Sequence, residues 1–191
     1  MTDPIAPLPP TPVLTTERLV LRPLEERDIP AVQRIFDDWR VVEHLHAGIP
    51  WPYPPDGAAT NMAQCLADRA KDEKFHWAIT LKGSDELRGR IDLWAFDPER
   101  RDSRGFWLDP ELWGHGLMTE AANAVTDYAL VTLGWPYLYL TNSLANRRSD
   151  RVKEKQGASL AYVEPWDFMD GRGERQVWLL TREAWLARKA K

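Results

Sequence analysis

The spacing of apolar positions changes along the chain between a strand-like period of two and a helix-like period near 3.6. Apolar runs bounded by turn residues predict strands at 14–23, 75–81, 87–96, 104–108, 137–140, 160–163 and 176–180. Amphipathic runs predict helices at 28–39, 58–71, 117–132 and 147–156. Strands and helices are interleaved without an internal repeat, so we expect a single α/β domain with a mixed sheet.

Length and composition narrow the class of protein. At 191 residues the chain can bury one full core, and we expect an extended Pro-rich tail at 1–12 followed by a domain at 13–191. A net charge of −4 argues against nucleic acid as the main ligand. The single cysteine allows no intramolecular disulfide, and no segment has the length of a signal-peptide core or a membrane helix. We therefore expect a cytoplasmic protein without a membrane partner.

Two glycines, Gly114 and Gly116, stand one residue apart between a predicted strand and a predicted helix. Glycine permits a positive φ and leaves the backbone open to an anion, and a helix N-terminus offers unpaired amides. This arrangement is typical of a phosphate site, to which Thr119 would add a hydroxyl. The Walker A and dinucleotide-binding motifs are absent from the sequence. A tight turn that binds nothing is the alternative.

The predicted helix at 147–156 is strongly basic. Residues 147–155 carry five basic side chains against two acidic ones, on a chain that is acidic as a whole. A local positive patch fits a nucleotide phosphate, whereas a solvated helix face with internal ion pairs is the alternative. Asn146 and Ser149 flank the start of this helix, where a ligand contact and an N-cap are both expected roles.

Four ordered segments resemble the GNAT superfamily of N-acyltransferases, and within it the ribosomal-protein-alanine N-acetyltransferases of the RimJ and RimL type. They are LTTERLVLRPLEERD at 14–28, IPWPYPPD at 49–56, GFWLDPELWGHGLMTEAANAVTDYAL at 105–130 and NRRSDRVKEKQGA at 146–158. The resemblance implies a central, mostly antiparallel sheet that splays at an acetyl-CoA site and is flanked by helices.

Acetyl-CoA is the cosubstrate that this resemblance implies. The loop 111–116 would hold its pyrophosphate, the backbone of 106–108 would pair with its pantetheine arm, and the Asn146/Ser149 pair would contact its thiol end. The residues expected to bind it are Phe106, Trp107, Leu108, Trp113, Gly114, His115, Gly116, Leu117, Met118, Thr119, Asn146, Ser149 and Arg151. The chain departs from the family pattern at Glu111, where Gln or Arg is usual, and at Ser103 and Ala161, where carboxylates are usual.

The implied chemistry is direct attack of a neutral amine on the acetyl carbonyl within a ternary complex. A backbone amide of 106–108 is expected to stabilise the oxyanion, and Ser149 is the candidate proton donor by motif position. Asp92 is the candidate base, with Glu43, His44, His46 and His76 as other candidates and a water chain as a further alternative. No metal is expected, because the histidines lack further ligands at the required spacing.

The amine acceptor is a protein N-terminus or a small molecule such as an amino-sugar antibiotic, a polyamine or an amino-acid conjugate. The aromatic residues Trp51, Tyr53, Trp94 and Trp166 are expected to bind it, with Asp167 and Asp170 attracting its charge. Either a monomer or a homodimer is compatible with the sequence. The alternative function is an acyl-CoA-binding module with lost or altered catalysis.

Overall fold

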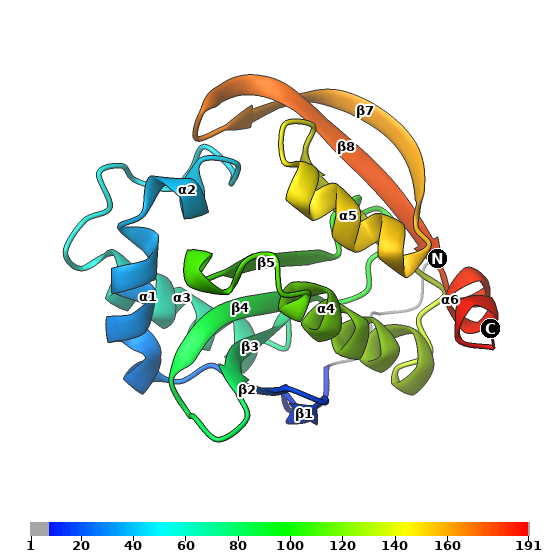
Figure 1. The fold of residues 1–191 in the computed structure, drawn as a ribbon, viewed down its shortest axis with the longest axis horizontal. Helices are drawn as coiled ribbons and strands as arrows, with labels where there is room; N and C mark the ends of the chain where they lie inside the picture. The colour runs from blue at the N-terminus through cyan, green and yellow to red at the C-terminus, as the bar shows by residue number, and fades with distance from the viewer. Residues whose placement is uncertain (1–7, 191) are drawn as a thin grey trace.

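Eight strands form one sheet in the computed structural model, which describes residues 8–190 (Figure 1). Their order across the sheet is β1-β2-β3-β4-β5-β6-β8-β7, and only β5 and β6 are parallel neighbours within these residues. The strands are β1 (Leu14–Thr15), β2 (Leu19–Pro23), β3 (Lys74–Leu81), β4 (Leu87–Trp94), β5 (Arg104–Leu108), β6 (Tyr137–Ser143), β7 (Ser159–Phe168) and β8 (Gly171–Thr181). This confirms the mixed α/β sheet that the sequence predicts.

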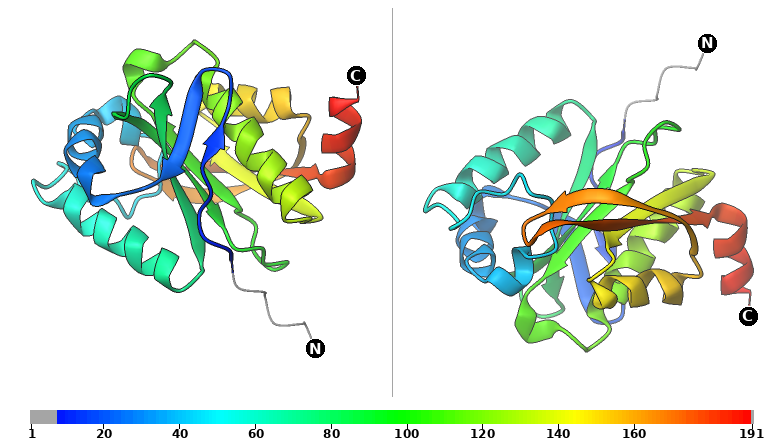
Figure 2. Two further views of the ribbon diagram at one scale, coloured as in Figure 1. Left: turned by 90° about the horizontal axis from the view of Figure 1, so that it is seen from below. Right: turned by 90° about the horizontal axis from the view of Figure 1, so that it is seen from above.

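Helices cover both faces of the sheet (Figure 2). They are α1 (Ile29–Phe36), α2 (Trp39–Val42), α3 (Gly57–Ala70), α4 (Leu117–Asp127), α5 (Arg147–Gln156) and α6 (Arg182–Lys189). Helices α1 and α3 pack on one face, and α4 packs on the opposite face with α5 beside it. Residues 1–7 of the expected tail lie outside the described residues, and 8–12 form neither helix nor strand.

Alternation along each strand divides the apolar side chains between two clusters. On β4, Ile91 and Leu93 pack toward Val125 of α4, whereas on the neighbouring β5 Trp107 packs toward Ile35 of α1. The position of a residue along β4 or β5 therefore determines the face of the sheet on which its side chain lies. Predicted site residues on opposite faces cannot contact one another.

The parallel neighbours β5 and β6 diverge. Within residues 8–190 they share one register pair, Arg104 with Leu140, preceded by a hydrogen bond of 2.7 Å from Ser103 N to Tyr139 O. The hydroxyl of Ser103 also accepts a hydrogen bond of 3.0 Å from Tyr139 N. Beyond Arg104, β5 continues to Leu108 without a strand on that side. The sheet therefore opens in a V, as the family resemblance implies.

The C-terminal part differs most from the pattern-based prediction. Strands β7 and β8 pair from Ser159/Leu179 to Phe168/Gly171, so the segment 165–174 is the end of a long hairpin and not a loop. Pro165 is accommodated because β7 is an edge strand, where a missing amide donor costs no ladder bond. The sequence prediction also missed α6, and it merged α4 with the π-helical segment Tyr128–Thr132.

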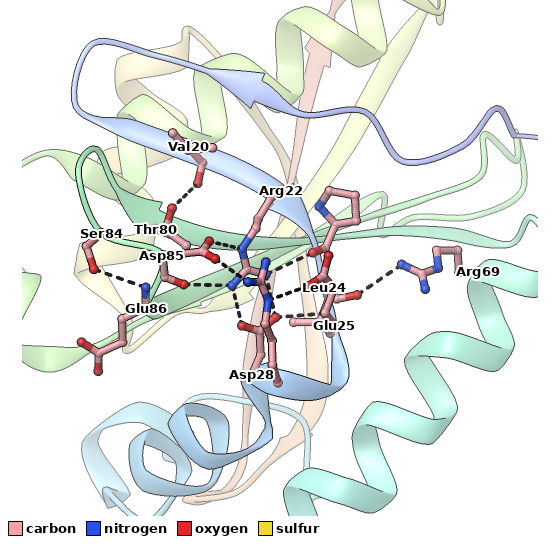
Figure 3. Close-up of polar contacts among 12 residues, drawn as sticks. Val20, Arg22, Leu24, Glu25, Asp28, Arg69, Thr80, Ser84, Asp85 and Glu86 are labelled. Carbon is pink, nitrogen blue, oxygen red and sulfur yellow. Dashed lines mark hydrogen bonds and ion pairs between the residues drawn. The ribbon is translucent and has the colours of Figure 1, made fainter.

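A buried ion pair joins β2 to the start of α1 (Figure 3). The Arg22 guanidinium donates to both oxygens of Asp28, at 2.9 and 2.7 Å, and its Nε donates to Asp85 at 2.6 Å. The Asp28 carboxylate also accepts from the amide of Glu25 at 2.9 Å. One guanidinium thus holds the first helix and the β3–β4 turn in a fixed position relative to the sheet.

We expect Arg22→Met to lower the free energy of unfolding by about 3–5 kcal/mol, because it leaves the buried Asp28 carboxylate without its cation. The matched control is Arg27→Met, which removes an exposed cation that also pairs with Asp85 and should cost about 1 kcal/mol or less. Urea unfolding of both variants measures the difference. Equal losses in the two variants would contradict the role given to Arg22.

Candidate active site

A pocket lies beside the free edge of β5, where β5 has diverged from β6. Three segments named from the sequence line it: the end of β5, the glycine loop with the start of α4, and the start of α5. Of the residues expected to bind acetyl-CoA, those that line the pocket are Phe106, Trp107, Leu108, Trp113, Gly114, Gly116, Leu117, Met118, Thr119, Asn146, Ser149 and Arg151. His115 is the exception, because it is exposed and is not part of the lining.

Both glycines of the loop adopt the left-handed conformation. Their φ angles are +84° at Gly114 and +76° at Gly116, and Gly116 is the N-cap of α4. A Cβ at Gly114 would have no neighbour within 4 Å, so the glycine is required by the backbone conformation and not by crowding. The amides of Leu117, Met118 and Thr119 begin the helix without intrahelical acceptors and lie at the pocket.

The loop is braced from the N-terminal strands. Arg18 donates to the carbonyl of His115 at 3.0 Å and forms an ion pair of 2.7 Å with Glu120 of α4. At its other end, the Glu111 carboxylate pairs with Arg88 at 2.5 Å and does not line the pocket. The acid that departs from the family pattern is therefore paired with a cation on β4, which also contacts Asp109 at 3.2 Å.

The inner edge of β5 offers free backbone groups. Bonds from Trp94 N to Ser103 O at 3.0 Å and from Asp109 N to Arg88 O at 2.7 Å set the hydrogen-bonding phase of the β4–β5 ladder. In that phase Phe106 and Leu108 direct their amides and carbonyls away from β4, into the V. The carbonyl of Leu108 accepts from the Trp113 indole at 2.9 Å. Phe106 keeps both of its polar groups for a ligand that lies along β5.

Four cations surround the pocket. Arg40 of α2 and Arg148, Arg151 and Lys155 of α5 are among its lining residues. The Arg148 guanidinium lies 4.0 Å from the centre of the Trp113 ring. Three of the five basic residues in the predicted helix at 147–156, which is α5, therefore face the pocket. This favours the phosphate-binding interpretation over a solvated helix face.

The start of α5 brings two of the predicted residues together. Asn146 is the N-cap, and its side chain accepts from the amide of Ser149 at 3.2 Å. The Ser149 hydroxyl is not used as a cap and instead accepts a hydrogen bond of 2.8 Å from the ammonium of Lys153. Asn146 thus fulfils the capping role that the sequence suggested, while the Ser149 side chain is available at the pocket.

Asp92, the candidate base, lies on the α3 face of the sheet and does not line the pocket. One oxygen bonds His76 Nδ1 at 2.8 Å, and the other pairs with Arg90 at 2.9 Å. Burial has the largest single effect and favours a neutral imidazole, but the hydrogen bonds and charges of Asp92 and Cys65 together outweigh it and raise the pKa of His76 to about 9. This enclosed ion pair offers no free oxygen to an acceptor amine, so the geometry does not support Asp92 as the base.

The four aromatic residues expected at the acceptor site also stand apart from the pocket lining. Trp51 packs on Trp39 with centroids 5.1 Å apart, and Tyr53 is buried against Phe36 at 5.3 Å. The Lys74 ammonium lies 5.6 Å from the Trp94 ring, and the Arg175 guanidinium lies 3.4 Å from the Trp166 ring. Each of the four rings is therefore engaged in packing or in a cation contact within this chain.

A further part of the pocket wall comes from residues that sequence reasoning did not assign to cofactor or acceptor binding. Val41, His44 and Leu45 line the pocket beside Arg40. The tip of the β7–β8 hairpin holds this segment through bonds of 3.0 Å from Met169 N to Leu45 O and from Asp170 N to Glu43 O. The short apolar run after Trp39 was a sequence signal that this segment packs against something. Its partner, the β7–β8 hairpin tip, is too distant in sequence to be inferred from that run.

Sequence reasoning also missed Asp102, which belongs to a charged turn. Its carboxylate accepts from the Thr141 hydroxyl at 3.0 Å, which places it beside the point where β5 and β6 diverge. Burial raises the pKa of the Asp102 carboxyl, although Thr141 and the surrounding cations act in the opposite direction. No local pattern distinguishes this aspartate from Asp97 in the same turn.

Residues 8–190 contain neither a candidate metal site nor a candidate membrane-spanning helix. No group of three or more His, Cys, Asp or Glu side chains there has the geometry of a metal site. No helix in that range combines the length and the apolar character needed to cross a membrane.

Comparison with known proteins agrees with this geometry. The family model described as an acetyltransferase (GNAT) domain matches residues 18–159, so the chain belongs to the GNAT acetyltransferase family. The uncharacterized N-acetyltransferase YoaA of Bacillus subtilis is 27% identical over 76% of this chain and 82% of that protein. The spermidine N(1)-acetyltransferase of Escherichia coli K12 is 26% identical over 73% of this chain and 72% of that protein.

Among solved structures, RimL, a ribosomal L7/L12 α-N-protein acetyltransferase in complex with coenzyme A, superposes with a TM-score of 0.76. The superposition covers 91% of this chain and 99% of that one at 15% identity, so it speaks for a shared fold. The family expected from the sequence is thus confirmed, and the protein is an N-acyltransferase by family.

We expect Gly114→Ala and Gly116→Ala to weaken coenzyme A binding by about tenfold or more, because an L side chain at positive φ costs about 1–2 kcal/mol and displaces the loop. Gly83→Ala is a matched control, since Gly83 has a φ of +86° and open space around its Cβ in the β3–β4 turn. Calorimetric titration with coenzyme A measures the effect. Equal affinity in all three variants would exclude the loop as a binding element.

The ion pair of His76 with Asp92 predicts a pH-dependent stability. A histidine pKa raised by folding stabilises the fold fully below the unfolded-state value of about 6.5. That contribution is lost as pH rises through about 9. Between about pH 6 and pH 9.5 the wild type should lose on the order of 2–3 kcal/mol more than His76→Gln. Urea unfolding at both pH values measures this, and parallel losses in the two proteins would refute it.

Proposed function

We propose that this protein is an acetyl-CoA-dependent N-acetyltransferase that moves the acetyl group to a primary amine by direct attack within a ternary complex. The observation that carries the proposal is the combination of a left-handed glycine loop at the N-terminus of α4 with the free backbone edge at Phe106. The first fits a pyrophosphate and the second fits an extended amide-containing arm. Arg148, Arg151 and Lys155 add positive charge beside the loop.

Each residue near the V has a defined task in this proposal. The amide of Phe106 donates a hydrogen bond to the acetyl carbonyl oxygen as negative charge develops there. Ser149, which lines the pocket, provides the proton for the leaving sulfur. Asn146 fixes the first turn of α5 and so the position of Ser149. Holding donor and acceptor together supplies much of the remaining rate enhancement.

We assign the removal of the amine proton to Asp102, acting through water, because Asp102, like Asp92, does not itself line the pocket. It follows β4 in the turn that leads into β5, and it reaches Thr141 next to the divergence point. A carboxyl whose pKa is raised by burial is a stronger base than an ordinary aspartate. Asp92 is less suited, since both of its oxygens are held by cations.

The acceptor we propose is a cationic primary amine, either a protein N-terminus or a polyamine. His44 lines the pocket and lies 3.5 Å from Glu43 and 3.2 Å from Asp170, so two carboxylates stand at the acceptor side. Acidic groups there attract an ammonium before it loses its proton. The spermidine acetyltransferase relative supports a polyamine as acceptor. The RimL fold neighbour supports a protein N-terminus.

The test combines coenzyme A and acetyl-CoA binding by calorimetry with thiol release over an amine panel. The panel contains peptides with free Ala and Ser N-termini, spermidine, an aminoglycoside and free lysine. We expect binding of both nucleotides and turnover of at least one acceptor. Binding without turnover over the whole panel would favour an acyl-CoA-binding module, and failure to bind either nucleotide would exclude both functions.

A further inference from the structure

Lys153 is a buried cation directly behind the pocket. It lies on α5 one turn after Ser149, and its side chain is 1% exposed. Its ammonium lies 5.6 Å from the centre of the Phe106 ring, which itself lines the pocket. Among residues 8–190, no carboxylate lies within ion-pair distance of this ammonium. A lysine without a counter-ion in such a place is expensive to keep charged, so its role needs an explanation.

The partner of Lys153 is the Ser149 hydroxyl. The ammonium nitrogen donates to Ser149 Oγ at 2.8 Å, in a buried contact between residues four apart on one helix. A hydroxyl has one proton and can accept at its lone pairs, so this bond leaves the Ser149 proton free to point elsewhere. Ser149 lines the pocket whereas Lys153 does not. The lysine therefore holds the hydroxyl with its proton available to the pocket.

The charges around Lys153 favour easy loss of its proton. Burial has the largest effect and the Arg104 guanidinium of β5 adds to it, so that the pKa of Lys153 falls to about 7. Asp150 of α5 and Asp102 before β5 oppose this shift without cancelling it. Arg104 is itself buried, and it is held by Thr126 at 2.7 Å and Gln156 at 2.7 Å.

We propose that Lys153 is a positioning residue that supplies, through Ser149, the proton taken up by the leaving thiolate. This proposal rests on the acetyl transfer proposed above. As the amine nitrogen bonds to the acetyl carbon, the carbon–sulfur bond breaks and its electron pair stays on sulfur. Ser149 Oγ passes its proton to that sulfur and takes one from Lys153, which becomes neutral. The amine loses its own proton to Asp102 or water, and Lys153 regains one from solvent.

This path explains why a serine can act as a proton donor here. An isolated hydroxyl is a poor acid, and donation from it would leave an alkoxide in a buried site. Coupling to a neighbouring ammonium avoids the alkoxide, because the hydroxyl gives one proton and receives another. The donor that must be charged is then Lys153, so donation weakens as pH rises through about 7.

The first experiment compares wild type with Lys153→Met, in which the new side chain has a similar length but no ionisable proton to donate. With the best acceptor of the panel, kcat should fall by about tenfold or more at pH 6, while the KM for acetyl-CoA stays within about twofold. The ratio of wild-type to variant kcat should decline as pH rises through about 7, and the ratio cancels the titration of the acceptor. Lys82→Met, a substitution in the distant β3–β4 turn, serves as control. A ratio that does not change with pH would overturn the proposal.

The Ser149→Ala background separates a relay from a general structural effect. If Lys153 acts through Ser149, adding Lys153→Met to Ser149→Ala should change kcat by less than about twofold, whereas a structural effect would persist in full. Equal losses in both backgrounds would contradict the relay.

One further measurement needs no acceptor. In wild type labelled with ¹³C-lysine, one side chain should titrate near pH 7, and its signal should be missing in Lys153→Met or, if that variant does not fold, in Lys153→Gln. A lysine that titrates only above pH 9 would overturn the relay. A wild type that passes this test but turns over no amine would instead count against the proposed function.

Discussion

The arrangement of the site depends on one constraint, the divergence of β5 and β6 after a single register pair. A strand that loses its neighbour exposes amides and carbonyls, and such groups require hydrogen-bond partners when they are enclosed. Here Trp113 satisfies the carbonyl of Leu108 from within the chain, and Phe106 is left for an extended ligand. The same geometry that interrupts the sheet thus leaves a backbone edge of fixed register, and this edge is where we propose that an arm with amide groups binds.

Two helices begin at this opening, and each uses a different device to present its first turn. At α4 the left-handed Gly116 turns the chain so that amides meet the pocket without a side-chain cap. At α5 the Asn146 side chain caps the helix, which frees the Ser149 hydroxyl from capping. Helix N-termini attract anions and developing negative charge. Under the proposed function, the phosphate end and the reacting end of the pocket share this electrostatic principle, with glycine where the backbone must be left-handed and a serine hydroxyl free of capping where a proton is needed.

Much of this could be predicted from the sequence, because it depends on local patterns. Apolar periodicity gave the main helices and strands, and the glycine spacing with its flanking strand and helix located the pocket. The ion pairs of Asp92 and Glu111 could not be predicted from local patterns. Asp92 pairs with His76 of β3 and Glu111 pairs with Arg88 of β4, and both partners are distant in sequence. The full length of the β7–β8 hairpin was not predicted, because Pro165 and the nearby glycines are typical of a loop. A proline is compatible with a strand here only because β7 lies at the edge of the sheet.

The buried position of Lys153 could have been predicted from the periodicity of α5. The basic residues of α5 were treated as one charged patch, although the helix has a buried face and an exposed face. Ser149, Val152 and Gln156 are buried at spacings of three, four and seven residues, and this phase places Lys153 on the inner face. A cation on the buried face of a helix is a conflict between local chemistry and packing, and such conflicts gather at functional sites.

The two halves of the pocket are built from different kinds of interaction, and under the proposed function this separates donor recognition from acceptor recognition. The donor half uses backbone groups of β5, the glycine loop and α4, whose positions are set by the sheet. The acceptor half uses side chains of the segment after Trp39, held by main-chain bonds to the tip of the hairpin, including one of 3.2 Å from Ala47 N to Asp167 O. Changes in these side chains alter the acceptor wall without moving the strands that hold the donor. In the proposed function, the acceptor preference therefore resides in the segment around His44 and the hairpin tip.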